Sequence, residues 1–177
     1  MKRKYLQLMA LCGFLVTFDQ LTKLLVVSSF RLGEALEIIP GFFELTYIRN
    51  TGAAFGILAS LPENIRVPFF ILIPIVALLA IGFYFYRVPD TQQPSIIGFS
   101  LIIGGAFGNL IDRIRLNYVV DFLYFHIGRH YFPAFNVADS AITVGVFVVV
   151  FLIMRDEWTQ RKKAKMLDQQ PSSPSGS

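Results

Sequence analysis

The sequence predicts an all-α polytopic membrane protein with four transmembrane helices and a small β-structure on its outer face. Hydrophobic side chains make up 54% of the 177 residues and only 16% are charged, whereas a soluble domain carries about 25% charged residues. The mean hydropathy is +0.57, and the apolar residues come in long blocks. This composition excludes a disordered chain, an ordinary soluble enzyme and a basic nucleic-acid-binding domain, so we expect no nucleic acid partner.

Four stretches are long enough to cross a hydrocarbon core of about 30 Å, which takes roughly 20 helical residues. They cover residues 5–27, 67–86, 95–111 and 137–154. The first follows a basic start but lacks a small-residue cleavage site, so we expect it to be retained rather than removed as a signal peptide. Pro74, in the second, is tolerated in lipid-embedded helices.

Basic residues predict the orientation of these spans. They are densest near the two termini, at Lys2, Arg3, Lys4, Arg161, Lys162, Lys163 and Lys165. Positive charge marks the cytoplasmic flanks of membrane helices. We therefore expect both termini in the cytoplasm and the loops 28–66 and 112–136 on the outer side.

Outside the spans, the chain divides into a structured loop and a tail. Residues 36–39 and 43–49 are β-favouring runs separated by Pro40-Gly41, which predicts a hairpin on the membrane surface. We expect residues 1–158 to form one membrane-embedded domain. The polar residues 159–177 are expected to be a disordered cytoplasmic tail.

Polar side chains recur at one depth in three of the spans. At 1.5 Å per residue, Asp19, Asn109 and Asp139 lie roughly 21–24 Å from the cytoplasmic ends of their helices, and Asp112 lies slightly further. Asp121 follows nine residues after Asp112 and is expected to fold back to the same level. Ionisable groups inside a membrane are costly and are candidates for function. The sequence thus predicts a carboxylate-rich site just beneath the outer surface.

Two aspartates held close together cannot both ionise readily, so one keeps a proton at neutral pH. The ionised carboxylate can then take a proton from water while the protonated one polarises a carbonyl oxygen. This pattern favours hydrolysis of an amide by a pair of aspartates. The rival nucleophiles are poorly supported, since Ser140 has no histidine near it in sequence and Cys12 lies deep in the first span.

Each candidate also has a structural interpretation. Asn136 followed by Asp139 is typical of an ordinary helix start. Asp19 and Lys23 are four residues apart and can pair for structural reasons alone.

The remaining polar features admit other functions. Asp112 beside Arg113 is compatible with a charge pair at a helix end. His126 and His130 would suit a metal only if helical, and we predict no metal. A proton-coupled transporter would also bury aspartates in its spans, but near the midplane and with internal repeats. A membrane-assembly factor would need the polar cluster only for helix packing.

Five segments, in order, resemble the signatures of the bacterial lipoprotein signal peptidases, also called type II signal peptidases. They are Asp19-Gln20-Leu21-Thr22-Lys23, Asn50-Thr51-Gly52-Ala53-Ala54-Phe55-Gly56, Gly104-Gly105-Ala106-Phe107-Gly108-Asn109-Leu110-Ile111-Asp112-Arg113, Val119-Val120-Asp121-Phe122 and Phe135-Asn136-Val137-Ala138-Asp139. Any one of them would be weak. Together they extend from the first predicted helix to the start of the fourth, about Asp19 to Asp139, and are highly specific.

The resemblance implies an intramembrane aspartyl endopeptidase without a metal or organic cofactor. Such enzymes remove signal peptides from prolipoproteins by cutting before a cysteine that carries diacylglycerol. By this resemblance Asp121 and Asp139 are the catalytic pair. The positions that support the pair or hold substrate are Asp19, Lys23, Asn50, Gly105, Asn109, Arg113 and Asn136. The family also has an extramembrane β-sheet cradle, which fits the predicted hairpin.

The same resemblance implies a place and partners. We expect a multi-pass protein of the bacterial cytoplasmic (inner) membrane, with its active site near the outer, periplasmic face. Its partners would be prolipoproteins bearing diacylglyceryl-cysteine and the membrane lipids, and we expect a monomer. The apolar helix of the signal peptide is expected to dock between spans, approaching closely along the glycine-rich third span.

Overall fold

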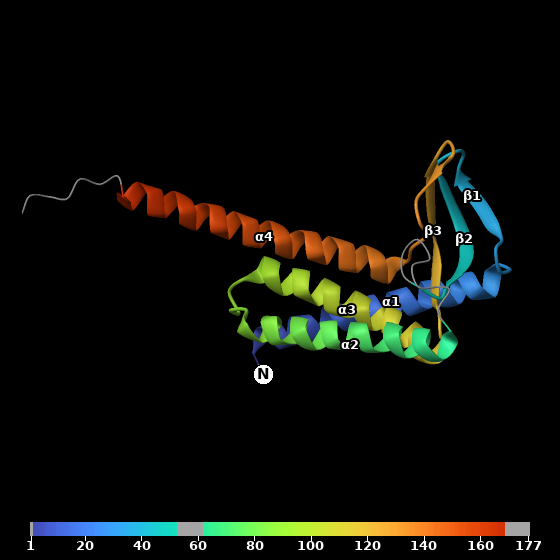
Figure 1. Cartoon of the computed structure of the whole chain (residues 1–177), viewed down its shortest axis with the longest axis horizontal. Helices are drawn as coiled ribbons and strands as arrows, with labels where there is room; N and C mark the ends of the chain where they lie inside the picture. Colours follow the sequence, from blue (N-terminus) through green and yellow to red (C-terminus); the bar gives the residue numbers. More distant parts are fainter. Residues whose placement is uncertain (1, 53–61, 169–177) are drawn as a thin grey trace, which may run out of the picture.

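The computed structural model describes residues 2–52 and 62–168, which form four helices and four strands. The helices are α1 (Arg3–Ser29), α2 (Glu63–Arg87), α3 (Gln93–Leu116) and α4 (Val137–Asp168). The strands are β1 (Ala35–Ile39), β2 (Phe43–Asn50), β3 (Val119–Ile127) and β4 (His130–Tyr131). The helices run alongside one another, and the sheet stands across one end of the bundle (Figure 1).

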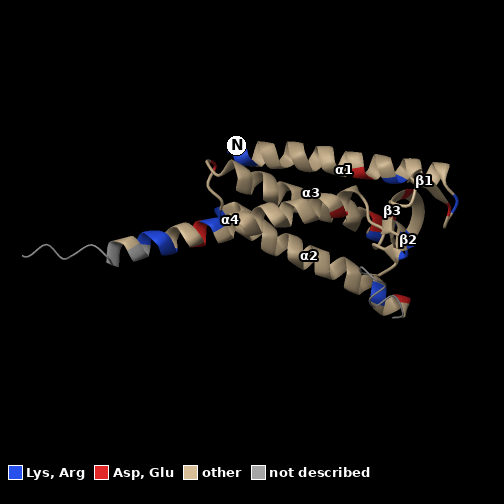
Figure 2. Cartoon of the chain, turned by 90° about the horizontal axis from the view of Figure 1, so that it is seen from above, with Lys and Arg blue, Asp and Glu red and all other residues tan. Residues whose placement is uncertain are grey.

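All four helices are long and apolar enough to cross a membrane. Their outward faces expose large apolar side chains such as Leu24, Leu79 and Phe147, as expected for surfaces that contact lipid tails. Figure 2 shows that lysines, arginines and acidic residues concentrate towards the two ends of the bundle. The predicted four-span architecture is therefore confirmed. The amino terminus and the end of α4 lie at the same end, opposite the sheet (Figure 1).

Helix α3 lies at the centre of the bundle and contacts each of the other three helices. Glycines allow this close approach. A Cβ on Gly105 would collide with the backbone oxygen of Ala138 in α4, and one on Gly108 would lie 2.7 Å from the Asp19 carboxylate. Gly104 packs in the same way against α1, at Leu15. The expectation that a substrate helix approaches along these glycines is wrong, because α1 and α4 already cover them.

The four strands form one antiparallel sheet in the order β1-β2-β3-β4. The predicted hairpin corresponds to β1 and β2, which pair Leu36 with Leu45. The second outer loop adds β3, which pairs with β2 and sets Ile48 opposite Asp121. The sheet lies at one end of the helical bundle, and its central strands lead directly to the predicted site.

Two segments differ from the sequence expectation. Helix α3 runs on to Leu116 and ends with Asn117 in the left-handed conformation, φ 63°, so Asp112 and Arg113 are helical rather than part of an outer loop. Helix α4 runs on to Asp168, so the part of the expected disordered tail from 159 to 168 is helical. This part contains several straight-chain residues with high helix propensity, and the rest of the expected tail lies outside the described residues.

Candidate active site

The start of α4 is built by two residues of the predicted site. The Asp139 backbone N–H donates to Asn136 Oδ1 at 2.9 Å, and the Asn136 backbone N–H donates to Asp139 Oδ2 at 3.2 Å. This reciprocal arrangement is a capping box, which satisfies backbone donors that a helix start leaves unpaired. The structural interpretation of Asn136 and Asp139 is therefore correct, and the same bonds also fix the position of the Asp139 carboxylate.

Asp121 lies in strand β3 and is 2% exposed. Its two carboxylate oxygens accept hydrogen bonds from two different amides. Asn136 Nδ2 donates to Oδ1 at 2.7 Å, and Asn50 Nδ2, from the end of β2, donates to Oδ2 at 2.9 Å. Asn136 therefore contacts Asp121 through its side chain and Asp139 through its backbone, which brings the two acids to one place.

Asn109, in α3, holds the second acid. Its Nδ2 donates to Asp139 Oδ1 at 2.7 Å, while its Oδ1 accepts from Lys23 Nζ at 3.0 Å and from Asn136 Nδ2 at 3.1 Å. Because Lys23 and Asn136 can only donate to that oxygen, the amide group of Asn109 must point to Asp139. The orientation of this amide is thus determined by its neighbours.

Lys23 forms the base of the network and is 3% exposed. Its Nζ lies 2.8 Å from Asp19 Oδ2 and 3.0 Å from Asp112 Oδ2. Each of these carboxylates also accepts a backbone N–H near one of the central acids: Asp19 from Ala138 at 2.9 Å, and Asp112 from Val120 at 3.1 Å. The buried lysine and its two acids therefore tie α1 and α3 to the segments that carry Asp139 and Asp121.

The environment of Asp121 favours its protonated form. Burial raises the pKa of Asp121 from its ordinary value of 3.8 to about 7, and the charge of Asp139 adds to this rise. The hydrogen bonds from Asn50 and Asn136 and the charge of Lys23 oppose it. A carboxyl group with such a pKa can hold or release a proton near neutral pH, as acid–base chemistry requires.

A cavity of about 530 Å³ opens beside the network, and we call it the aspartate cavity. Asp139 and Asn50 line it, together with Arg113, whose guanidinium lies 5.6 Å from the ring centre of Phe70. The first turns of α4 form another part of the wall, including Thr143. A substrate in this cavity would meet Asp139 directly.

The structure brings together the acids and amides that the sequence singled out, and it adds others. Asp112 was expected beside Arg113 at a helix end, but its partners are Lys23, the Val120 N–H and Gln20 Nε2, at 2.8 Å. Gly105 contributes by packing α3 against the first turn of α4. Of the second motif, only Asn50, Thr51 and Gly52 lie within the described residues.

The described residues contain no group of three or more histidine, cysteine, aspartate or glutamate side chains arranged to hold a metal ion. His126 and His130 are not on a helix but in β3 and β4, on opposite sides of a hairpin turn. The polar side chains at the site are carboxyl groups, amides, Arg113 and the buried Lys23. Four spanning helices with this polar site at one end define a multi-pass membrane enzyme.

Comparisons with known proteins identify the family. The model of the signal peptidase (SPase) II family matches residues 11–155. A lipoprotein signal peptidase of Syntrophotalea carbinolica is 47% identical over 149 residues, 84% of this chain and 91% of that protein. One from Staphylococcus aureus is 38% identical over 152 residues, 86% of this chain and 89% of that protein.

The fold agrees with this assignment. A bacterial membrane enzyme solved by the in meso method at 2.3 Å resolution superposes with a TM-score of 0.76 and 32% identity. The match covers 94% of this chain and 93% of that one. The chain belongs to the signal peptidase II family and is a membrane peptidase. Nothing in these comparisons favours a transporter.

Proposed function

We propose that Asp121 and Asp139 together hydrolyse the peptide bond that precedes a diacylglyceryl-modified cysteine in prolipoproteins, releasing the signal peptide. The observation that carries this proposal is the shared contact with Asn136, which holds Asp121 next to Asp139, the acid that lines the aspartate cavity. Their hydrogen-bond partners come from α3, from the end of β2 and from the segment between β4 and α4. The pair is therefore fixed before substrate arrives, as efficient electrostatic catalysis requires.

In the proposed reaction Asp139 acts as the base, because it borders the cavity that admits water. It takes a proton from water as the oxygen attacks the scissile carbonyl carbon. Asp121, protonated below its pKa of about 7, gives its proton to the carbonyl oxygen, which yields a neutral diol. The diol then returns a hydroxyl proton to Asp121, and Asp139 protonates the departing nitrogen as the C–N bond breaks.

Arg113 and Asn50 line the same cavity and are suited to hold the substrate backbone. Asn109 donates to Asp139, Asp19 accepts the Ala138 N–H beside it, and Lys23 acts one step further away by donating to Asn109. They are positioning residues in this proposal. Gly105 keeps α3 close enough to α4 for these contacts to form.

We further propose that both termini are cytoplasmic and that the sheet and the aspartate cavity face the periplasm across the inner membrane. The basic flanks of the first and last spans support this orientation. Buried acyl chains would keep a lipid-modified cysteine at the headgroup level, and a site at the end of the bundle suits that depth. We also propose that the protein acts as a monomer in contact with lipids.

The decisive experiment compares Asp121→Asn and Asp139→Asn with the wild type in cleavage of a purified prolipoprotein, with and without its diacylglyceryl group. Both variants should fold, span the membrane and fail to cut. Asp90→Asn, in the described turn between α2 and α3, is the matched control and should cut normally. Normal cleavage by either site variant would refute the assignment of the pair, and equal cleavage of unmodified precursor would refute the substrate class.

A further inference from the structure

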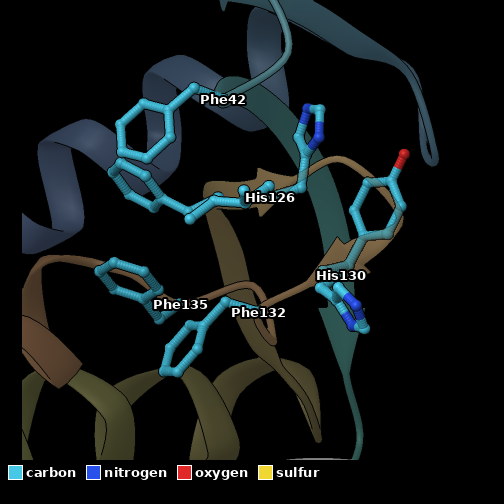
Figure 3. Close-up of a pocket in the computed structure, with 8 residues that line it drawn as sticks. Phe42, His126, His130, Phe132 and Phe135 are labelled. Carbon is cyan, nitrogen blue, oxygen red and sulfur yellow. The ribbon is translucent and has the colours of Figure 1, made fainter.

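A second cavity, of about 500 Å³, lies against the sheet and is here called the aromatic pocket. Its walls carry Phe42, Phe125, Phe132 and Phe135, and the β3–β4 hairpin contributes His126. Figure 3 shows Phe42 on one side of the open space, Phe132 and Phe135 on the opposite side, and His126 and His130 towards one end. The pocket is thus an apolar slot with imidazole groups at one end.

The walls of the aromatic pocket are held by ring contacts among its own residues. The ring centres of Phe42 and Phe125 are 5.5 Å apart, those of Phe125 and Phe135 are 5.7 Å apart, and those of Phe132 and Phe135 are 6.0 Å apart. Rings at these separations attract one another beyond simple burial. The slot is therefore preformed, which is typical of ligand sites.

The aromatic pocket adjoins the aspartate cavity. Phe132 and Phe135 line both of them, so a group in the aromatic pocket lies one ring away from a peptide beside Asp139. Any substituent that enters the slot must accordingly be attached close to the scissile bond. In the proposed substrate, the side chain immediately after that bond is the lipid-modified cysteine.

His126 indicates the polarity of the ligand. Its side chain is 8% exposed, and its Nε2 lies 3.1 Å from a carboxylate oxygen of Glu44. The contact with Glu44 does not have hydrogen-bond geometry, and Nδ1 has no hydrogen-bond partner among the described residues. Buried polar atoms are normally hydrogen-bonded, and an imidazole N–H needs an acceptor. A neutral carbonyl oxygen supplies one, whereas an anionic ligand would be repelled by Glu44.

We infer that the aromatic pocket binds one acyl-ester arm of the diacylglyceryl group on the substrate cysteine. The hydrocarbon chain contacts the phenylalanine rings, and the ester carbonyl accepts a hydrogen bond from His126. This inference rests on the proposed function and adds the place where the lipid is recognised. It explains why the aromatic pocket should share a wall with the aspartate cavity, which Asp139 lines.

The test compares two substrates that have the same peptide but carry long or very short acyl chains. Phe42→Ala should lower kcat/KM about fivefold for the long-chain substrate, through KM, and leave the short-chain substrate unchanged. Ile127 lines the aromatic pocket and is 73% exposed, so a larger side chain can be accommodated there. Ile127→Trp should narrow the pocket and lower kcat/KM for the long-chain substrate only. Leu36→Ala, in strand β1, removes an apolar side chain that is 53% exposed, against 43% for Phe42, and should change neither rate.

His126→Phe keeps a ring of similar shape and removes both nitrogens. It should lower kcat/KM for a diester substrate and leave a diether analogue, which has no ester carbonyl, unaffected. Direct contact is tested with a diacylglyceryl-cysteine peptide that carries a photoreactive group on one chain. It should label residues of the aromatic pocket in the wild type and not in Ile127→Trp.

Other outcomes overturn the inference. An equal loss of kcat/KM for the long-chain and short-chain substrates would mean that the pocket binds the peptide. Labelling by a photoreactive phospholipid alone would mean that it binds bulk lipid. Full activity of both Phe42→Ala and Ile127→Trp would remove the pocket from substrate binding. If the wild type cut no lipid-modified precursor but its pocket were still labelled, the proposed function would fail while the lipid site stood.

Discussion

Replacing Asp121 by asparagine tests whether this acid is held protonated inside the fold. A raised pKa means that the folded state binds a proton that the unfolded chain has already lost. The resulting stability is fully present below pH 3.8 and is lost as the pH rises through about 7. Asparagine cannot ionise, so the variant should not show this loss.

The size of the effect follows from the shift. Three pKa units correspond to about 4 kcal/mol in the free energy of unfolding. For a chain of this length, that is a change of roughly 10 °C in Tm. Between pH 4 and pH 8 the Tm of the wild type should therefore fall by about this amount relative to that of Asp121→Asn.

The assay is thermal unfolding of the detergent-solubilised proteins, followed by circular dichroism at several pH values. Asn50 and Asn136 each donate an amide N–H to one oxygen of Asp121. In Asp121→Asn one of these oxygens is replaced by an NH₂ group, which cannot accept that hydrogen bond. This loss should lower Tm by an amount that does not depend on pH. Only the pH-dependent part of the difference in Tm between the wild type and Asp121→Asn reports on the protonation of Asp121. A difference in Tm that stays the same from pH 4 to pH 8 would refute the reasoning, as would cleavage activity that does not fall above pH 7.

Four further outcomes are expected. Gly105→Ala should destabilise the fold by about 1–3 kcal/mol, because the new methyl group meets the Ala138 oxygen, whereas Gly82→Ala, with no atom within 4 Å, should be neutral or stabilising in the same melting assay. Lys23→Met should cost about 3–5 kcal/mol by leaving two buried carboxylates unpaired; an unchanged Tm would contradict the network. Asp19→Ala should lower Tm but retain measurable turnover, and complete inactivity in a folded protein would give Asp19 a chemical role. Cleavage should survive EDTA, and inhibition that zinc reverses would point instead to His126.

The depth of the site could be predicted from the sequence because the rise of a helix is fixed. Asp19, Asn109 and Asp139 each lie a known distance from one end of a span, and they do meet in one network. The hairpin was also predictable, since strand-favouring runs flank Pro40-Gly41. Both predictions rest on local geometry that tertiary contacts do not alter.

The role of Asp112 could not be predicted in this way. Its carboxylate accepts the Val120 N–H, and that contact depends on how the chain turns from α3 into β3, which no periodicity encodes. The strand in the second outer loop could not be predicted for a related reason. Its strand β3 forms by pairing with β2, a partner about 70 residues earlier in the chain.

At the end of α4 the sequence analysis predicted too little structure, because residues 159–168 were expected to be disordered and are helical. Its composition suggested disorder, yet a charged segment that continues an existing helix does not have to nucleate a new one. Glu157 and Arg161, four residues apart and 3.7 Å from each other, add a side-chain pair on its surface. Polarity alone was therefore a poor guide to where this helix ends.

Because Asn136 has two structural roles, we expect heat inactivation to begin with local unfolding at the start of α4. The residue caps the first turn of α4 and also forms hydrogen bonds with both acids. Fraying of that turn by a few ångströms would therefore abolish catalysis while the helix bundle stayed folded in the bilayer. Catalytic activity should therefore be lost at a temperature several degrees below that at which the transmembrane helices unfold. Engineering for heat tolerance should accordingly begin at this turn rather than in the lipid-facing surface.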